Sequence, residues 1–139
     1  MNTHGYIKTG LWIGGMALAF GIGTVVGEQA PPTESKGVQI STPESLDLAP
    51  WIDDMKGRRL QIRKLTVEPG GVIANHSHDD RPDASYLVKG TLTEFRAGGY
   101  SMVRPSDTLR TSGKGVTHWI ENKGTEPAVL IVVGAFKQS

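Results

Sequence analysis

The amino-acid sequence predicts an all-β domain, a sandwich or barrel of antiparallel strands, preceded by one N-terminal hydrophobic helix. From Arg58 onward short apolar or alternating runs recur, and clusters of Gly, Pro, Asn and Asp separate them. None of these runs keeps a helical period over three turns. Many short strands at nearly regular intervals over roughly 100 residues are typical of one domain of this class.

The predicted N-terminal helix covers residues 9–27, a run of 19 uncharged residues between Lys8 and Glu28. Such a helix is about 28 Å long, close to the roughly 30 Å hydrocarbon core of a bilayer. We expect residues 1–27 to be a retained membrane anchor, with a signal peptide cleaved after Gly27 as the alternative. Because Lys8 and the amino terminus form the positive flank, the rest of the chain is expected on the non-cytoplasmic side, the periplasm in a bacterium.

Small residues recur along one face of this hydrophobic helix. Their four-residue spacing lets helix backbones approach closely in lipid, which would suit docking against another membrane protein. We favour the other interpretation, an accidental pattern in a glycine-rich segment. The residues of this face are Gly15, Ala19, Gly23 and Gly27.

Residues 28–50 are expected to form a linker with a lead-in strand at residues 38–40. The segment is rich in proline and has little apolar periodicity, which is typical of an extended connection. The folded domain is then expected at residues 51–139.

The strands of that domain are expected where apolar residues alternate or cluster. They are residues 60–67, 72–74, 84–88, 92–95, 102–103, 116–122 and 128–133. Glycine, proline, serine and asparagine predict turns between them, at residues 68–71, 89–90, 97–99, 104–107, 112–115 and 122–124.

Composition excludes several functions. The 15 basic and 14 acidic residues nearly balance, so the chain lacks the strong positive field of a nucleic-acid-binding protein. The chain has no cysteine, which excludes disulfides, iron–sulfur ligation and thiol catalysis. Any bound metal ion must therefore be held by histidine and carboxylate side chains.

The histidines are the most informative residues, because the chain has four and three of them fall in the β-rich region. His4 lies in the N-terminal flank and is set aside. Residues two apart in a strand point to the same face, so His76 and His78 are expected to project side by side. His118, from another strand, would complete a set of three imidazoles that can bind a metal ion.

The sequence around His76 resembles the first motif of the cupin superfamily, G-x5-H-x-H-x(3,4)-E-x6-G. Gly70 is followed after five residues by His76, His78 comes two residues later, and Asp83 and Gly90 complete the spacing. Every interval fits, and the one departure is Asp83 in place of glutamate. The chain most resembles small single-domain cupins of type 2.

The second cupin motif, G-x5-P-x-G-x2-H-x3-N, is matched at its end by Gly115, His118 and Asn122. The chain departs from it at Gly113, where proline is usual, and at Asp107, where glycine is usual. The resemblance covers residues 58–136 and implies a jelly-roll β-barrel, in agreement with the strand pattern.

The resemblance implies a divalent metal ion held by His76, His78 and His118, with Asp83 in the position of the glutamate ligand. Aspartate is one methylene shorter, so its carboxylate either ligates or acts through a water or a neighbouring ligand. Imidazole ligands with open positions suit iron, manganese, nickel, copper or zinc, and the residues do not distinguish among these metals.

Other side chains have weaker claims to the site. Tyr86 is expected to face away from Asp83, because the two lie an odd number of residues apart in one strand. Arg81 is expected to pair with neighbouring aspartates, although it could meet an anionic ligand at the barrel mouth. The remaining candidates are Lys64 and Glu94 as acid–base groups, and Trp51 and Trp119 as barrel or interface packing.

Two functions stay open at this level. The first is a metal-dependent enzyme that acts on a small organic molecule on the non-cytoplasmic side of a membrane. The second is a non-catalytic, membrane-anchored cupin that serves as a ligand-binding or accessory subunit of a membrane protein complex. A homodimer is expected from the resemblance, and nucleic acid is not expected as a partner.

Overall fold

The computed structural model describes residues 30–99 and 101–137, and every regular element within these ranges is a β-strand. The strands are β1 Lys36–Ile40, β2 Glu44–Asp47, β3 Arg58–Ser77, β4 Asp83–Lys89, β5 Leu92–Arg96, β6 Ser101–Arg104, β7 Thr108–Ser112, β8 Thr117–Glu121 and β9 Ala128–Lys137. The hydrophobic helix predicted at residues 9–27 lies outside the described ranges. Within those ranges the structure contains no helix with the length and hydrophobicity needed to cross a membrane.

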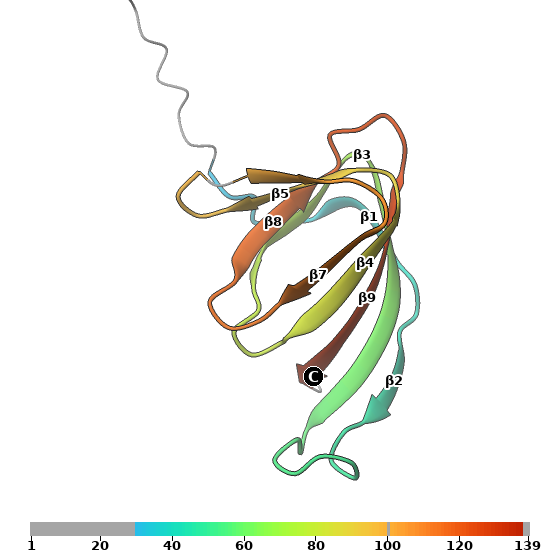
Figure 1. Ribbon diagram of the computed structural model, residues 1–139, viewed down its shortest axis with the longest axis vertical. Helices are drawn as coiled ribbons and strands as arrows, with labels where there is room; N and C mark the ends of the chain where they lie inside the picture. The colour runs from blue at the N-terminus through green and yellow to red at the C-terminus, as the bar shows by residue number, and fades with distance from the viewer. Residues whose placement is uncertain (1–29, 100, 138–139) are drawn as a thin grey trace, which may run out of the picture.

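The strands form one antiparallel sheet in the order β6-β5-β8-β3-β9-β4-β7, and β1 and β2 also pair with β3. Figure 1 shows the sheet folded on itself, with β5 and β8 in one wall and β9, β4 and β7 in the other. Strand β3 belongs to both walls. The predicted all-β barrel is confirmed.

Strand β3 runs for 20 residues and joins the two walls. Residues 58–67 pair with β9, whereas residues 72–77 pair with β8. The sequence predicted a turn at residues 68–71, and this prediction was wrong. The chain only bends there, because Gly70 adopts a positive φ of 74°. Backbone hydrogen bonds of 2.9 Å join Gly70 and Gly71 to Asn122, which directly follows β8, and keep the bend within the sheet.

The other predicted strands match observed ones within a few residues at each end, except that β9 continues four residues beyond its predicted end, to Lys137. Strands β2 and β7 were not predicted. Each contains a single apolar residue, Leu46 and Leu109, and both of these side chains are exposed. No apolar alternation therefore marked either segment, and pairing with β3 or β4 defines them instead.

The hydrophobic core lies between the two walls and leaves room for a site beside it. Its buried members come from both walls and are Leu65, Val67, Leu87, Leu92, Ile120, Ala128, Leu130 and Val132. Because β3, β4, β5, β8 and β9 all contribute, the core fixes the spacing of the strands that carry the site residues.

Backbone conformation explains two of the motif positions. Gly90 has a φ of 84°, and a Cβ atom there would lie 2.8 Å from the Ala128 Cα, so any other residue is strained. Asp107, at a position where the motif usually has glycine, also has a positive φ of 62°. Aspartate tolerates this left-handed conformation better than most residues. Its carboxylate also accepts a 2.7 Å hydrogen bond from the Tyr86 hydroxyl.

Asn122, the last residue of the second motif, has a structural role. Its side chain is 1% exposed, and its Nδ2 donates 2.8 Å hydrogen bonds to the backbone oxygens of Val67 and Glu126. Its Oδ1 accepts a hydrogen bond from the Gly124 amide at 2.9 Å. The side chain thereby joins the β8–β9 turn to the bend of β3.

Candidate metal centre

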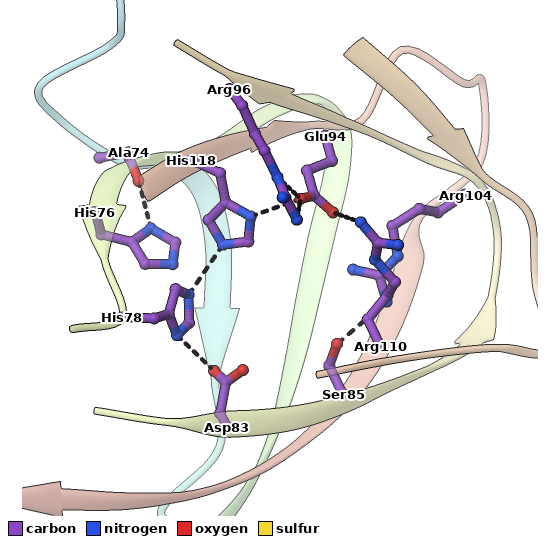
Figure 2. A network of polar contacts seen from close by, with 10 residues as sticks. All are labelled: Ala74, His76, His78, Asp83, Ser85, Glu94, Arg96, Arg104, Arg110 and His118. Atoms are coloured by element: carbon purple, nitrogen blue, oxygen red, sulfur yellow. Dashed lines mark hydrogen bonds and ion pairs between the residues drawn. The ribbon is translucent and has the colours of Figure 1, made fainter. Parts of the chain in front are cut away.

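The structure brings together the three histidines of the β-rich region. His76 lies near the end of β3, His78 follows that strand directly, and His118 lies opposite His76 in β8. The ring centroids are 4.7–4.9 Å apart, and one nitrogen from each ring lies within 4.8 Å of the others. Figure 2 shows the rings turned toward one another. The predicted side-by-side placement of His76 and His78 is confirmed.

Oxygen acceptors hold the outer nitrogens of His76 and His78. His76 Nδ1 donates a 2.7 Å hydrogen bond to the Ala74 carbonyl. His78 Nδ1 donates to the Arg81 carbonyl at 3.2 Å and lies 3.6 Å from the Asp83 carboxylate. Such acceptors fix the ring orientation of metal-binding histidines and leave Nε2 with a free lone pair.

Glu94 has the same role for His118. His118 Nδ1 lies 3.0 Å from Glu94 Oε1, and both side chains are almost completely buried. Arg96 Nη2 contacts the same oxygen, Oε1, at 2.8 Å, and Arg110 Nη2 lies 3.5 Å from the other oxygen, Oε2. Burial alone would raise the Glu94 pKa, but the contacts with His118 and these arginines lower it to about 2. Glu94 is therefore charged at neutral pH and keeps a proton on His118 Nδ1.

The spacing of the inner nitrogens fits a bound cation. His78 Nε2 and His118 Nε2 are 3.0 Å apart. The oxygen acceptors beside Nδ1 favour a proton on that nitrogen of each ring, and both Nε2 atoms then present lone pairs to each other, an arrangement that a cation between them stabilises. Two nitrogens bound at about 2.1 Å and at right angles to one metal ion would be separated by about 3 Å.

The protonation of the rings also fits metal binding. The pKa of His76 is lowered from 6.5 to about 4, chiefly by burial and also by the neighbouring His118, Arg81 and His78, while the hydrogen bond to Ala74 opposes the shift. Burial likewise lowers the pKa of His78. At neutral pH these imidazoles are uncharged, so a metal ion need not displace a proton from them.

Asp83 lies beside the three imidazoles and outside their compact group. The group that shares the 4.8 Å separation contains the histidines alone, and the Asp83 carboxylate faces His78 Nδ1. Burial raises the pKa of Asp83, while His78 and His118 oppose that shift. Ligation by Asp83 stays a prediction, and the observed contact of its carboxylate is with His78.

A cavity of about 320 Å³ opens beside the histidines. Core residues Leu65, Ile120 and Leu130 form its apolar wall. Its polar wall carries the three histidines, Asp83 and three arginines, Arg63, Arg81 and Arg104. Of these arginines, the sequence indicated only Arg81, as a weak candidate.

The other candidates lie away from the imidazoles. Tyr86 faces outward as predicted and bonds to Asp107, and Lys64 is exposed. Trp119 packs as predicted, stacked on Phe95 with centroids 5.1 Å apart, whereas Trp51 is 77% exposed.

Sequence reasoning did not identify two roles. Glu94 was considered as an acid–base group and not as the partner of His118. Arg104 was not considered, although it is 3% exposed. One feature of the sequence could have indicated that Glu94 is buried. It lies two residues after the apolar Leu92 in a short predicted strand, so both side chains are on the same face.

Comparison with known proteins identifies the family. The model of the cupin domain matches residues 63–134, more than half of the chain. The chain therefore belongs to the cupin family.

Two curated relatives match a little more than half of the chain. The chain is 31% identical over 77 residues to xanthan biosynthesis protein XanB of Xanthomonas campestris pv. campestris, covering 55% of this chain and 16% of that protein. It is also 31% identical over 78 residues to a putative mannose-1-phosphate guanylyltransferase of Vibrio cholerae, covering 56% and 17%. The chain thus spans about a sixth of the length of these relatives.

Solved structures agree with the fold. A Klebsiella pneumoniae protein with a double-stranded β-helix domain superposes with a TM-score of 0.51 at 22% identity, covering 55% of this chain and 66% of that one. Oxalate oxidase superposes with a TM-score of 0.51 at 23% identity, covering 70% and 50%. At these identities the likeness shows the fold alone.

Acidification should destabilise the metal-free protein in two pH ranges. The unfolded chain takes up the His76 proton near pH 6.5 and the folded chain only near pH 4, so stability falls as pH drops between these values. Glu94 stabilises above its usual pKa of 4.5, and this contribution is lost toward pH 2. We expect a loss on the order of 1–3 kcal/mol between pH 7 and pH 4.5.

Urea unfolding in the presence of a chelator measures this loss. The free energy of unfolding of the His76→Ala variant should change less between pH 6.5 and pH 4.5, because this variant lacks the histidine whose pKa is lowered by folding. A free energy of unfolding that stays constant from pH 7 to pH 4.5 in the unmodified protein would contradict the lowered pKa of His76.

Replacing Glu94 should weaken metal binding without removing a ligand. Glu94→Gln keeps the size of the side chain but removes the charge that orients His118, and loss of such a partner typically costs about tenfold to a hundredfold in metal affinity. Competition with a chromophoric chelator measures the affinity. Glu121→Gln is the matched control, because Glu121 is the last residue of β8 but its carboxylate accepts a hydrogen bond from Trp119 rather than from a histidine. Equal affinity in both variants would exclude this role of Glu94.

Proposed function

We propose that this protein is a metal-dependent enzyme that acts on a small organic molecule bound in the barrel cavity. The observation that carries this proposal is the convergence of nitrogens from His76, His78 and His118 within 4.8 Å. When bound, a divalent metal ion with open positions polarises a substrate oxygen, lowers the pKa of a bound water or, if it is redox-active, transfers electrons.

The residues of the chain supply the rest of the site. The three imidazoles hold the metal ion, and Glu94 fixes the orientation of His118. The apolar wall formed by Leu65, Ile120 and Leu130 limits water beside the metal ion, which strengthens electrostatic interactions there. A cavity of about 320 Å³ lies in the size range of small-molecule sites.

The proposal places the domain on the non-cytoplasmic side of a membrane, the periplasm in a bacterium. Its support is the hydrophobic run at residues 9–27 that follows Lys8. Retention of this run as an anchor is preferred, and cleavage as a signal peptide is the alternative.

The second candidate function is a non-catalytic, membrane-anchored accessory subunit of a membrane protein complex. The small-residue face at Gly15, Ala19, Gly23 and Gly27 favours it, because such a face allows close helix packing. The expected homodimer also stays a prediction.

Metal content tests the site directly. In full-length protein purified without a histidine tag, elemental analysis should find close to one metal ion per chain, and the double variant His76→Ala, His78→Ala should lose it. His4→Ala is the matched control, because it removes a histidine from the N-terminal flank and should leave metal content unchanged. Metal content that is the same in the double variant and the unmodified protein would refute the site.

Two further observations separate the candidate functions. Turnover of a small-molecule panel by the metal-loaded protein, lost in the double variant, supports the enzyme. Detergent extraction within a large complex, together with no turnover by the metal-loaded protein, supports the accessory subunit.

A further inference from the structure

The charged residues that line the cavity do not balance one another. They are Arg63, Arg81 and Arg104 on the cationic side and Asp83 alone on the acidic side. Burying a charge is costly unless an opposite charge or a full set of hydrogen bonds compensates for it. The cavity therefore has an excess of positive charge even before a metal ion is added.

Arg104 is the most deeply buried of these cations. It lies at the end of β6, is 3% exposed, and reaches across the barrel to β4, where Nη2 donates a 3.1 Å hydrogen bond to Ser85 Oγ. Its Nε–H has no hydrogen-bond partner within residues 30–99 and 101–137. No carboxylate of these residues forms an ion pair with it. Burial lowers the pKa of Arg104, and Glu94 and Asp83 oppose this shift from beyond ion-pair distance.

Arg63 carries a second unsatisfied donor into the same cavity. Its guanidinium stacks over the Phe136 ring at 4.5 Å, and its Nε–H also has no partner in the part of the chain that the structure describes. Burial lowers the pKa of Arg63, Arg81 lowers it further and Asp83 opposes the shift. Asp83 is the one acidic residue that lines the cavity among the described residues, and its carboxylate lies beside His78 Nδ1 at 3.6 Å.

We infer that the cavity binds its small-molecule ligand through an anionic oxygen group, a carboxylate or a phosphate, held by Arg104 together with Arg63. This inference rests on the small-molecule site proposed above and adds the chemical class of the ligand. A guanidinium presents parallel N–H donors that match the paired oxygens of both groups. The anion would satisfy the free Nε–H donors and balance the buried charge, with the rest of the ligand beside the imidazoles.

Calorimetric titration of full-length, metal-free protein tests the inference without requiring turnover. The probes are succinate and methyl phosphate, with succinamide as a neutral analogue of the size of succinate. At least one of the two anions should bind about tenfold or more tightly than succinamide, and Arg104→Met should weaken that anion about tenfold to a hundredfold. The anion that binds better tells whether the group is a carboxylate or a phosphate.

Matched variants separate the cavity from general charge effects. Arg59 lies on β3 four residues before Arg63, and its Nε also has no hydrogen-bond partner among the described residues, but it does not line the cavity. Arg59→Met should therefore leave anion affinity unchanged, whereas Arg63→Met should weaken it. If Arg104→Met fails to fold, Arg104→Lys keeps the charge, and loss of the paired donors should still weaken binding about tenfold.

The inference is overturned if succinamide binds as tightly as both anions, or if the anion binds equally to folded Arg104→Met and to the unmodified protein. Metal uptake, measured on separate samples of the same preparations after metal is added, keeps this outcome separate from the proposed metal site. Anion binding by a protein that takes up no metal would support the inference and refute the metal site. Metal uptake without a preference for the anions would support the metal site and overturn the inference.

Discussion

The backbone pairing of strand β3 is the constraint on which the rest of the structure depends. Its first half is bonded to β9 and its second half to β8, so one strand holds the two walls of the barrel together. The bend at Gly70 lets the strand leave one wall and enter the other without losing its hydrogen bonds. The same bend brings His76 opposite His118, and the site exists only where both walls are correctly paired.

The buried polar groups of the barrel are of two kinds, those whose charge is balanced by neighbours and those that lack such partners. Glu94 is fully compensated by His118, Arg96 and Arg110, and it acts as a fixed anion behind one imidazole. The inner nitrogens of His78 and His118, by contrast, face each other at 3.0 Å, and the Arg104 Nε–H has no partner among the described residues. These side chains all line the cavity, where a metal ion would bind the inner nitrogens and an anionic ligand would accept from Arg104.

The sequence predicted the fold class and the three histidines because both depend on local spacing. Strand periodicity, the two-residue interval between His76 and His78, and the motif spacing to Gly90 are readable within a few residues. The continuity of β3 was not predictable, because a Pro-Gly-Gly segment has the composition of a turn, and only its partners convert it into a bend.

Non-local contacts account for the remaining omissions. The pairing of Glu94 with His118 depends on the register between β5 and β8, and Arg104 reaches the cavity only because β6 lies at the edge of the same wall. Strand β7 is recognisable only through its pairing with β4, since Leu109 points to solvent. Register between distant strands is set by the assembled barrel and leaves no signature in a single sequence.

The central claim is that imidazoles from β3 and β8 hold one metal ion at the wall of the barrel cavity. Crystallographic data collected at the absorption edge of the bound metal test it most directly, because anomalous scattering locates the ion itself. The account predicts a single strong anomalous peak within bonding distance, about 2.1 Å, of nitrogens from His76, His78 and His118. A peak in the loop between β3 and β4 or elsewhere on the surface, with none between the three rings of metal-loaded protein, would contradict it.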